Sequence, residues 1–427
     1  MHSREEGTFT GSVTEAIDGQ WIYSDKSVRL RTGDSLYYWV KVDYFDGSKT
    51  VSHYKEDQTF IVAELIPSDG YVSSTSIPTT SSTYILTTTS TTEYPPCKET
   101  PTTVNAKPSC QGKLIFEEDF NELSVERWLT EVRFAGEPDY EFVIYNNDKE
   151  NLYVEKKMLH IRPTLTEDKY GAGFVSKAGK FDLGESCTGT TQSFECVQKP
   201  KAWLILPPIL SAQISTKPNF SFVYGVIEIR ARLPRGDWIY PELFLKPKNN
   251  MYGLGYESGL LRIAFVPGND DMSQQLSGGC VLGQTFVARN YAIKSVRSEK
   301  RWTNDFHVFK VEWKPDSIVL SVDDEIYGKI NPPEGGFASE EANLGLDAEI
   351  VQNWKKGSQL APFDKEMHLV LGVGVGGLCF SNTSSNKPWD SDDPKAQLHF
   401  YRSLDVWSKT WSDSSELVVD YIRIWAL

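Results

Sequence analysis

Two glutamates near the middle of the chain have the side chain needed for acid–base or nucleophilic chemistry. Glu242 lies in "IYPELFLKP" and Glu257 lies in "GYESGLLRIAFV", on a neighbouring segment. A catalytic carboxyl must share a strand face with the residues that line the site, because side chains alternate between the two faces of a strand. Glu257 has the opposite parity to Leu260, and the strand-like run from Leu260 to Phe265 contains no carboxylate. Both glutamates are therefore interpreted as surface or rim residues.

Other catalytic and metal-binding patterns are missing from the sequence. Ser258 in "GYESG" does not have the G-x-S-x-G spacing of a serine-hydrolase elbow. The six histidines form no H-E-x-x-H pair, and none of the six cysteines lies in a C-x-x-C pair. We therefore predict no metal site and no cofactor.

The charge balance argues against nucleic acid as a partner. The 427 residues include 44 Lys and Arg and 58 Asp and Glu, which gives a net charge of −14. Such a chain repels phosphate backbones. No apolar stretch approaches the roughly 18 residues of a membrane-spanning helix, so no membrane span is predicted either.

The cysteine spacing favours disulfides and an oxidising compartment. Cys187 and Cys196 bracket the short segment "TGTTQSFE", which suits a loop or hairpin. Cys97 and Cys110 could close the junction before a second unit. We expect both pairs to form disulfides.

Further signals agree with secretion. Asn219 in "NFS" and Asn382 in "NTS" are predicted N-glycosylation sites.

Cys280 and Cys379 are expected to pair with each other or to stay buried as free thiols. The chain opens with the polar stretch "MHSREEGTFTGSVTEAIDG" and not with an apolar signal peptide, so the natural start is expected to lie further upstream.

A Ser/Thr-rich segment divides the chain. In "SSTSIPTTSSTYILTTTSTTEYPP", from Ser73 to Pro96, 15 of 24 residues are Ser or Thr. This composition buries too little apolar surface to offset its ordering entropy, so it predicts an O-glycosylated linker. We predict an amino-terminal unit at 1–68, the linker at 69–109 and a second unit at 110–427.

The second unit is predicted to be all-β. It is dense in short strand-like runs such as "FVYGVIEIRARL", "HVFKVEWK" and "HLVLGVGVGG". In "VIEIRARL" the residues Val226, Glu228, Arg230 and Arg232 fall on one face, and Ile227, Ile229, Ala231 and Leu233 fall on the other. This alternation is typical of a half-buried antiparallel strand. Many such strands and few helical stretches indicate a large jelly-roll β-sandwich.

An ordered series of segments resembles the glycoside hydrolase family 16 β-glucanases. The series runs through "FEEDFNELSVERWLTEV", "YVEKKMLHIRPT", "SAQISTKPNFSFVYGVIEIRARLPRGDWIYPELFLKP", "FHVFKVEWKPDSIVLSVDDEIYG" and "VVDYIRIW". The two-unit layout is similar to the insect β-1,3-glucan recognition proteins, also called Gram-negative bacteria binding proteins. The resemblance covers nearly all of 110–427 and implies a concanavalin-like glucanase fold.

The resemblance breaks at the catalytic strand. Active members carry S-G-E-I-D-I-M-E there, with a nucleophile Glu, a helper Asp and an acid/base Glu, and the last Glu shares the face of the first only across a bulge. Here Ser258 and Gly259 match, but Leu260, Arg262 and Phe265 stand at the three catalytic positions. Leu and Phe do not ionise and Arg stays protonated, so none of them can do this chemistry. We predict a domain without catalytic residues.

Aromatic residues of the same region are candidate sugar contacts. The resemblance places Trp238, Tyr240 and Phe244 along the sugar groove, where aromatic faces pack on pyranose rings. Strand parity puts Phe244 with the other two if Pro241 does not break the strand. The alternative is that these aromatics are ordinary core residues. His307 matches a position near the groove, and a structural histidine is an equally good interpretation.

The first unit resembles the carbohydrate-binding module family 39 domain of the same insect proteins. The matching run is "DGQWIYSDKSVRLRTGDSLYYWVKVDYFDG". The resemblance implies a partial immunoglobulin-like β-sandwich, because the leading strands of that domain would precede Met1. Trp21 and Trp39 are candidate sugar contacts there, with a core position as the alternative.

The resemblance implies a secreted, non-catalytic pattern-recognition protein of innate immunity. Its ligand would be microbial β-1,3-glucan or a related polymer such as lipopolysaccharide or peptidoglycan. Its protein partners would be an extracellular serine-protease cascade or other recognition proteins. Two alternatives stay open: an active β-1,3-glucanase with non-standard catalytic residues, and an extracellular structural or adhesive protein.

Overall fold

The computed structural model describes residues 35–45, 50–61 and 97–427. The chain divides into two compact units, 1–89 and 90–427. In the first unit, β1 (Ser35–Phe45) and β2 (Thr50–Ile61) pair antiparallel, with a register shift between Tyr38 and Val40. Trp39 therefore lies at the irregular point of β1, whereas Trp21 and the remainder of the predicted immunoglobulin-like sandwich lie outside the described residues.

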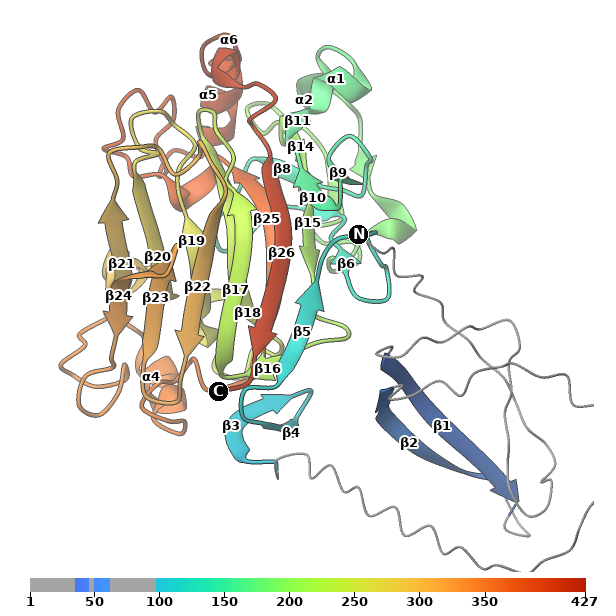
Figure 1. Cartoon of the computed structure of the whole chain (residues 1–427). Coiled ribbons are helices and arrows are strands. Elements are labelled where there is room, and N and C mark those ends of the chain that lie inside the picture. The colour runs from blue at the N-terminus through green and yellow to red at the C-terminus, as the bar shows by residue number, and fades with distance from the viewer. Residues whose placement is uncertain (1–34, 46–49, 62–96) are drawn as a thin grey trace, which may run out of the picture. The chain divides into compact units, whose positions relative to one another are not determined.

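The second unit consists mainly of two large sheets that lie face to face (Figure 1). The eight-stranded sheet has the order β24 (Glu325–Ile330), β23 (Ile318–Val322), β22 (His307–Trp313), β17 (Gly225–Arg232), β26 (Leu417–Trp425), β10 (Met158–Ile161) and β9 (Leu152–Glu155), with β5 (Leu114–Glu118) also paired to β26. The ten-stranded sheet has the order β21 (Ala292–Arg297), β20 (Gln275–Val281), β19 (Leu260–Phe265), β18 (Ile239–Pro247), β25 (Met367–Val375), β16 (Phe222–Val223), β3 (Glu99–Val104) and β4 (Lys107–Cys110), with β15 (Gln213–Ser215) joining β25 to β6 (Leu129–Thr130). The fold is the predicted all-β jelly-roll sandwich.

The core lies between the two sheets because each central strand turns one apolar face inward. In β17 the residues Ile227, Ile229 and Ala231 are fully buried, and the residues between them are half-buried. This is the alternation that the sequence predicts. From the other sheet, Leu243 and Leu371 are fully buried in the same core.

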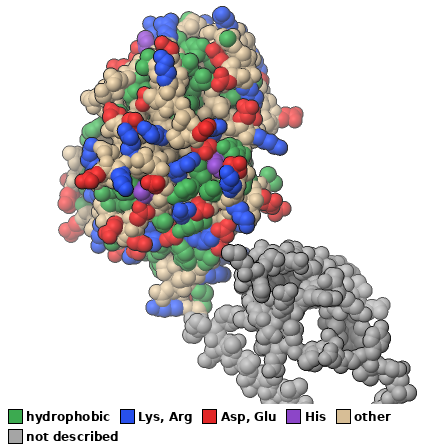
Figure 2. Space-filling model, turned by 45° about the horizontal axis from the view of Figure 1, so that its top comes forward, with side chains coloured by type: hydrophobic (Ala, Val, Ile, Leu, Met, Phe, Trp, Pro, Cys, Tyr) green, Lys and Arg blue, Asp and Glu red, His purple; other side chains and the backbone are tan. Residues whose placement is uncertain are grey.

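The outward face of the eight-stranded sheet carries opposite charges on neighbouring strands. Arg230 pairs with Asp420, and Lys310 lies 2.9 Å from Glu228. Figure 2 shows acidic and basic side chains interspersed over the visible surface of this unit. Such cross-strand pairs support the strand register.

Smaller elements decorate the sandwich. One small sheet contains β11 (Thr164–Leu165), β14 (Ile209–Ser211), β8 (Val143–Tyr145) and β7 (Arg133–Phe134), and another contains β12 (Phe181–Asp182) and β13 (Val197–Gln198). The helices are α1 (Thr166–Tyr170), α2 (Phe174–Lys177), α3 (Phe286–Asn290), α4 (Ala348–Trp354), α5 (Ala396–Arg402) and α6 (Leu404–Trp407), with 3₁₀ turns η1 (Gly184–Ser186), η2 (Gly255–Ser258), η3 (Gly377–Cys379) and η4 (Ser408–Thr410). None of the helices in the described ranges is both long and apolar enough to cross a bilayer.

The structure moves one domain boundary. The predicted linker at 69–109 extends too far, because β3 pairs with β16 and so belongs to the ten-stranded sheet. A disulfide between Cys97 and Cys110 closes the β3–β4 hairpin. Apolar content is low in "KETPTTVNAKPSC", so its strand character comes from pairing with the sheet and not from its own sequence pattern.

Candidate functional site

The ten-stranded sheet carries a small hollow. It is lined by the three residues that the sequence analysis places at the catalytic positions of the glucanases. Leu260, Arg262 and Phe265 of β19 all line it, together with Tyr240 and Phe244 of β18. Phe244 lies directly opposite Arg262 in the ladder, so the two side chains share a face. A register shift between Arg262 and Phe265 brings Phe265 to the same side. The resemblance to the glucanases predicts a bulge at this place in the strand, and the register shift lies there.

The hollow is almost filled by its own side chains. Its volume is about 10 Å³, which is room for about one water molecule. The Arg262 guanidinium lies 4.6 Å from the centre of the Phe265 ring and donates to the Cys379 sulfur at 3.7 Å. Arg262 thus fills the centre of the hollow beside β19.

An ion pair closes one side of the hollow. Arg289 Nη2 lies 2.7 Å from Asp139 Oδ1, and the Tyr256 hydroxyl donates to the other Asp139 oxygen. Burial alone would raise the pKa of Asp139, but Arg289 and Arg262 outweigh it and lower this pKa overall. Asp139 therefore stays ionised and paired, which makes it unsuitable as a proton donor.

Glu242 lies in the hollow, and the interpretation of it as a surface or rim residue is wrong. Its side chain is only 2% exposed, and it faces the hollow from the middle of β18. The Tyr145 hydroxyl donates to Oε1 at 2.8 Å, and Gln213 Nε2 donates to Oε2 at 2.9 Å. Burial raises the pKa of this carboxyl. Glu257, in contrast, is half-buried and accepts a bond from the Leu254 amide, so it caps the η2 turn outside the hollow.

Two glycines of β25 make room for this arrangement. Gly372 and Gly374 lie opposite Glu242 and Tyr240 in the ladder. A Cβ on Gly372 would lie 2.1 Å from Glu242 Oε2, and a Cβ on Gly374 would lie 2.3 Å from Tyr240 Cζ. The alternating glycines of "LGVGVGG" are therefore the sequence signal that could have located the floor of the hollow, since glycine inside a strand often marks a close approach.

Glu242 belongs to a set of four charged side chains that we call the charged wall: Arg133 of β7, Glu141 from the segment before β8, and Glu242 and Lys246 of β18. Of these four, Glu242 lines the hollow. Arg133 Nη2 donates to Gln213 Oε1 at 3.2 Å, which links it to Glu242 through the Gln213 amide. Burial, and then the charges of Glu242 and Asp139, raise the pKa of Glu141 to about 8. Burial and the nearby Arg133 lower the pKa of Lys246. Apart from Glu242, sequence reasoning did not single out any of these residues.

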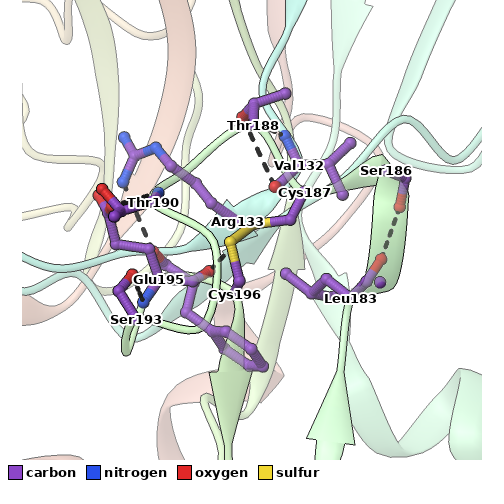
Figure 3. The surroundings of a disulfide bond; sticks show 12 residues. Val132, Arg133, Leu183, Ser186, Cys187, Thr188, Thr190, Ser193, Glu195 and Cys196 are labelled. Carbon is purple, nitrogen blue, oxygen red and sulfur yellow. Dashed lines mark hydrogen bonds between the residues drawn. A yellow bond between two sulfur atoms is a disulfide. The ribbon is translucent and has the colours of Figure 1, made fainter.

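The loop closed by the Cys187–Cys196 disulfide holds Arg133 in place (Figure 3). Thr188 exchanges two hydrogen bonds with Val132: its amide donates to the Val132 carbonyl at 2.9 Å, and its hydroxyl accepts from the Val132 amide at 3.1 Å. The Thr188 hydroxyl also donates to Glu131 Oε2 at 2.6 Å, and this oxygen lies 3.4 Å from Arg133 Nε. The disulfide loop therefore reaches the charged wall through two side chains.

The residues of the second unit that were predicted to contact sugar lie in different parts of it. Tyr240 and Phe244 line the hollow, and β18 continues through Pro241. Trp238 does not line it: this residue precedes β18 with φ 66°, is 2% exposed, and packs against Phe380 and Trp389 in the core. Its left-handed backbone breaks the strand parity on which its assignment depended. His307 belongs to β22 and bonds Asp323 at 2.6 Å, as a structural histidine does.

The sequons and free thiols have defined environments. Asn219 and Asn382 are both exposed. The Asn382 amide donates to Asp390 at 2.6 Å, within its own loop. Both sequons remain predictions as glycosylation sites. Cys280 is buried and Cys379 half-buried, and the two are not bonded to each other.

Two family models and a set of solved structures match parts of the chain. The CBM39 model, described as "Carbohydrate binding domain (family 32)", matches residues 1–93, and the model for glycosyl hydrolases family 16 matches residues 277–343. The laminarinase from Rhodothermus marinus covers 74% of this chain and aligns over 98% of its own length, at 21% identity and a TM-score of 0.47.

Curated relatives align over the whole chain. The β-1,3-glucan-binding protein of Tenebrio molitor is 50% identical over 100% of this chain and 88% of its own length. Gram-negative bacteria-binding protein 3 of Drosophila melanogaster is 31% identical over 100% of this chain and 87% of its own length. These relatives are named as binding proteins and not as glucanases. The chain belongs to the family of β-1,3-glucan-binding proteins and Gram-negative bacteria-binding proteins.

Proposed function

We propose that this protein binds β-1,3-glucan of microbial cell walls without cleaving it. It acts as a secreted recognition protein of innate immunity and passes the signal to an extracellular protease cascade. The 50% identical relative named for glucan binding supports the ligand. The immune role, the secretion and the protease cascade are inferred from the family resemblance. Lipopolysaccharide and peptidoglycan are further candidate polymers.

The observation that best supports binding without hydrolysis is the filled hollow. Retaining glycoside hydrolysis needs two carboxyls about 5 to 5.5 Å apart, and inversion needs two that flank the scissile bond with room for a water. Leu260, Arg262 and Phe265 provide no carboxyl, and about 10 Å³ cannot admit a sugar ring. The glucan would therefore bind outside this hollow.

Glu242 and Glu141 are the remaining candidates for a catalytic pair, and Glu141 with a pKa of about 8 would be protonated at neutral pH. Glu242 argues against this alternative. Each of its carboxylate oxygens already accepts a hydrogen bond, and the side chain is 2% exposed. An attack on an anomeric carbon would need one of these oxygens to be free and accessible.

Sedimentation with insoluble polysaccharides tests the proposed ligand. The purified full chain is mixed with curdlan, peptidoglycan and cellulose in parallel, and the pellet is assayed for protein. We expect retention on curdlan and none on cellulose. Equal recovery from all three, or from none, would favour the structural or adhesive alternative.

A further inference from the structure

We propose that a row of basic side chains across the ten-stranded sheet binds a phosphate group. The row consists of Lys217, which follows β15, His368 of β25 and Lys246 of β18, and we call it the basic row. None of the three residues lines the hollow. The inference goes beyond the proposed binding of an uncharged glucan, because it adds a site for an anion.

Strand register brings the three residues of the basic row side by side. Lys246 lies directly opposite His368 in the ladder between β18 and β25. On the other side of β25, the Thr216 amide donates to the Leu369 carbonyl at 3.0 Å and so extends the β15–β25 ladder. Lys217 is therefore the next residue beside His368. Because Leu369 points into the core, His368 and the two lysines that flank it share the outer face of the sheet.

Two buried side chains in and beside the row have polar atoms without a partner. The His368 side chain is 4% exposed, and its Nδ1 has no hydrogen-bond partner within residues 97–427. The Ser215 hydroxyl, two residues before Lys217 on the same strand face, is also buried and unpartnered in that range. An unpartnered buried polar atom costs free energy, which a bound polar group recovers. These two atoms indicate a ligand independently of the lysines.

The two lysines of the row have no acidic partner. Among the residues that the structure describes, the ammonium groups of Lys217 and Lys246 form no ion pair, and Lys217 is exposed while Lys246 is half-buried. A third lysine nearby, Lys248, is paired, because its Nζ lies 3.6 Å from Glu366 Oε2. Burial and the charges of all three lysines lower the pKa of His368 to about 3. His368 is therefore neutral, and the charge that acts on it is positive.

The carboxyls of the charged wall do not cancel this positive charge. Glu141, with a pKa of about 8, is protonated at neutral pH. Burial and the charge of Arg133 outweigh Glu242, so the pKa of Lys246 is lowered overall. The net charge of −14 on the whole chain is no obstacle, since salt screens charges beyond about 8 Å at physiological ionic strength. An anion is thus favoured at this place.

A phosphate group matches the donors of the site. A lysine ammonium only donates hydrogen bonds and binds phosphate as a compact point charge. The Ser215 hydroxyl and a neutral His368 ring can each donate one more bond. The phosphate oxygens accept all of these bonds and carry the charge that the two unpaired ammonium groups attract. A neutral sugar hydroxyl would leave that charge uncompensated.

Calorimetric titration of the purified full chain with inorganic phosphate, at constant ionic strength, tests the site. We expect one site per chain in the wild type. Lys217→Met and Lys246→Met should each weaken binding about tenfold, because each removes one charged donor. Lys156→Met is the matched control, since this lysine is 77% exposed and lies in the turn between β9 and β10 of the other sheet. It should bind phosphate as the wild type does.

A second titration distinguishes free phosphate from phosphate that is carried on a polymer. A poly(glycerol phosphate) chain is added in place of inorganic phosphate. Tighter binding of this chain, weakened by Lys217→Met, assigns the site to a phosphate-bearing polymer, and the reverse order of affinity assigns it to the free ion. Lys217 is exposed and forms no side-chain hydrogen bond in the described part of the chain, so its variant should melt with the wild type.

The outcomes separate the basic row from the proposed function. No binding of either phosphate ligand by the wild type, or equal binding by the wild type and both lysine variants, overturns this inference. The same proteins are sedimented with curdlan, and both lysine variants should be retained. Loss of that retention in Lys217→Met also overturns the inference, because the row would then bind the glucan. Phosphate binding by a wild type that curdlan does not retain overturns the proposed function alone.

Discussion

Glu141 is the residue whose ionisation should be visible in the stability of the protein. Burial is the main cause that raises its pKa from 4.5 to about 8. Between these two pH values the folded state holds a proton that the unfolded chain has lost. The free energy of unfolding therefore falls as the pH rises from about 4.5 to about 8, and then levels off with respect to this group.

Glu141→Gln should remove this pH dependence, because the amide cannot ionise. We expect the variant to melt above the wild type at pH 9, with a smaller difference at pH 5. Glu155→Gln, at a side chain that is 59% exposed, is the control. Thermal unfolding at both pH values is the measurement, and the same pH dependence in the wild type and in Glu141→Gln would show that the folded protein does not raise the pKa of Glu141.

Gly374 should be intolerant of any side chain. A Cβ would lie 2.3 Å from the Tyr240 ring, which is buried and has little room to move. Overpacking of this kind commonly costs about 1–3 kcal/mol, so Gly374→Ala should lose about that much stability in urea unfolding. Gly136→Ala, where a Cβ would meet nothing within 4 Å, should be neutral. Equal stability of the two variants would contradict the close packing of Tyr240 on β25.

Some of this residue-level detail could be read from the sequence and some could not. The alternation of β17 and the shared face of Leu260, Arg262 and Phe265 follow from the period of a strand and one bulge. The burial of Glu242 does not, because its partners Tyr145 and Gln213 are 97 and 29 residues away in the chain. The core position of Trp238 does not follow from the sequence either, because its left-handed backbone is set by contacts and not by local sequence.

At the scale of elements, the Cys187–Cys196 loop is expected to support the stability of the protein and the position of β7. Chain-entropy estimates give about 2–3 kcal/mol for a loop of this length. Replacing both cysteines by serine should cost about that much and speed amide hydrogen exchange at Val132, because the loosened loop no longer holds the Thr188 hydroxyl against the Val132 amide.

The Cys97–Cys110 pair provides a matched control for that experiment. It closes the β3–β4 hairpin, which pairs with β16 at one end of the ten-stranded sheet. Its serine double variant should lose stability but leave amide hydrogen exchange at Val132 unchanged. Equal acceleration of exchange at Val132 in the two double variants would mean that the Cys187–Cys196 loop has no specific role in positioning β7.

Some strands could be predicted from the sequence and others could not. Long strands with their own apolar pattern, such as β17, β22 and β26, could be recognised from the sequence. The strands β3 and β4 could not, since their residues are polar and become strands because β3 pairs with β16 and β4 pairs with β3. The linker was therefore drawn too long at its carboxyl end.

At the scale of the whole molecule, the protein combines a unit that matches a carbohydrate-binding domain with a glucanase-like sandwich. In the second unit, β19 has a register shift and Arg262 fills the centre of the hollow beside it. Both features agree with the proposed binding without hydrolysis.

Release of reducing ends from laminarin by the purified full chain, followed from pH 4 to pH 9, tests this account most directly. The protein should first be shown to sediment with curdlan, so that inactivity cannot be attributed to misfolding. We predict that it binds and releases no reducing sugar at any pH. Sustained release by the wild type that Glu242→Gln abolishes would contradict the account, because it would make Glu242 a catalytic residue of a working glucanase.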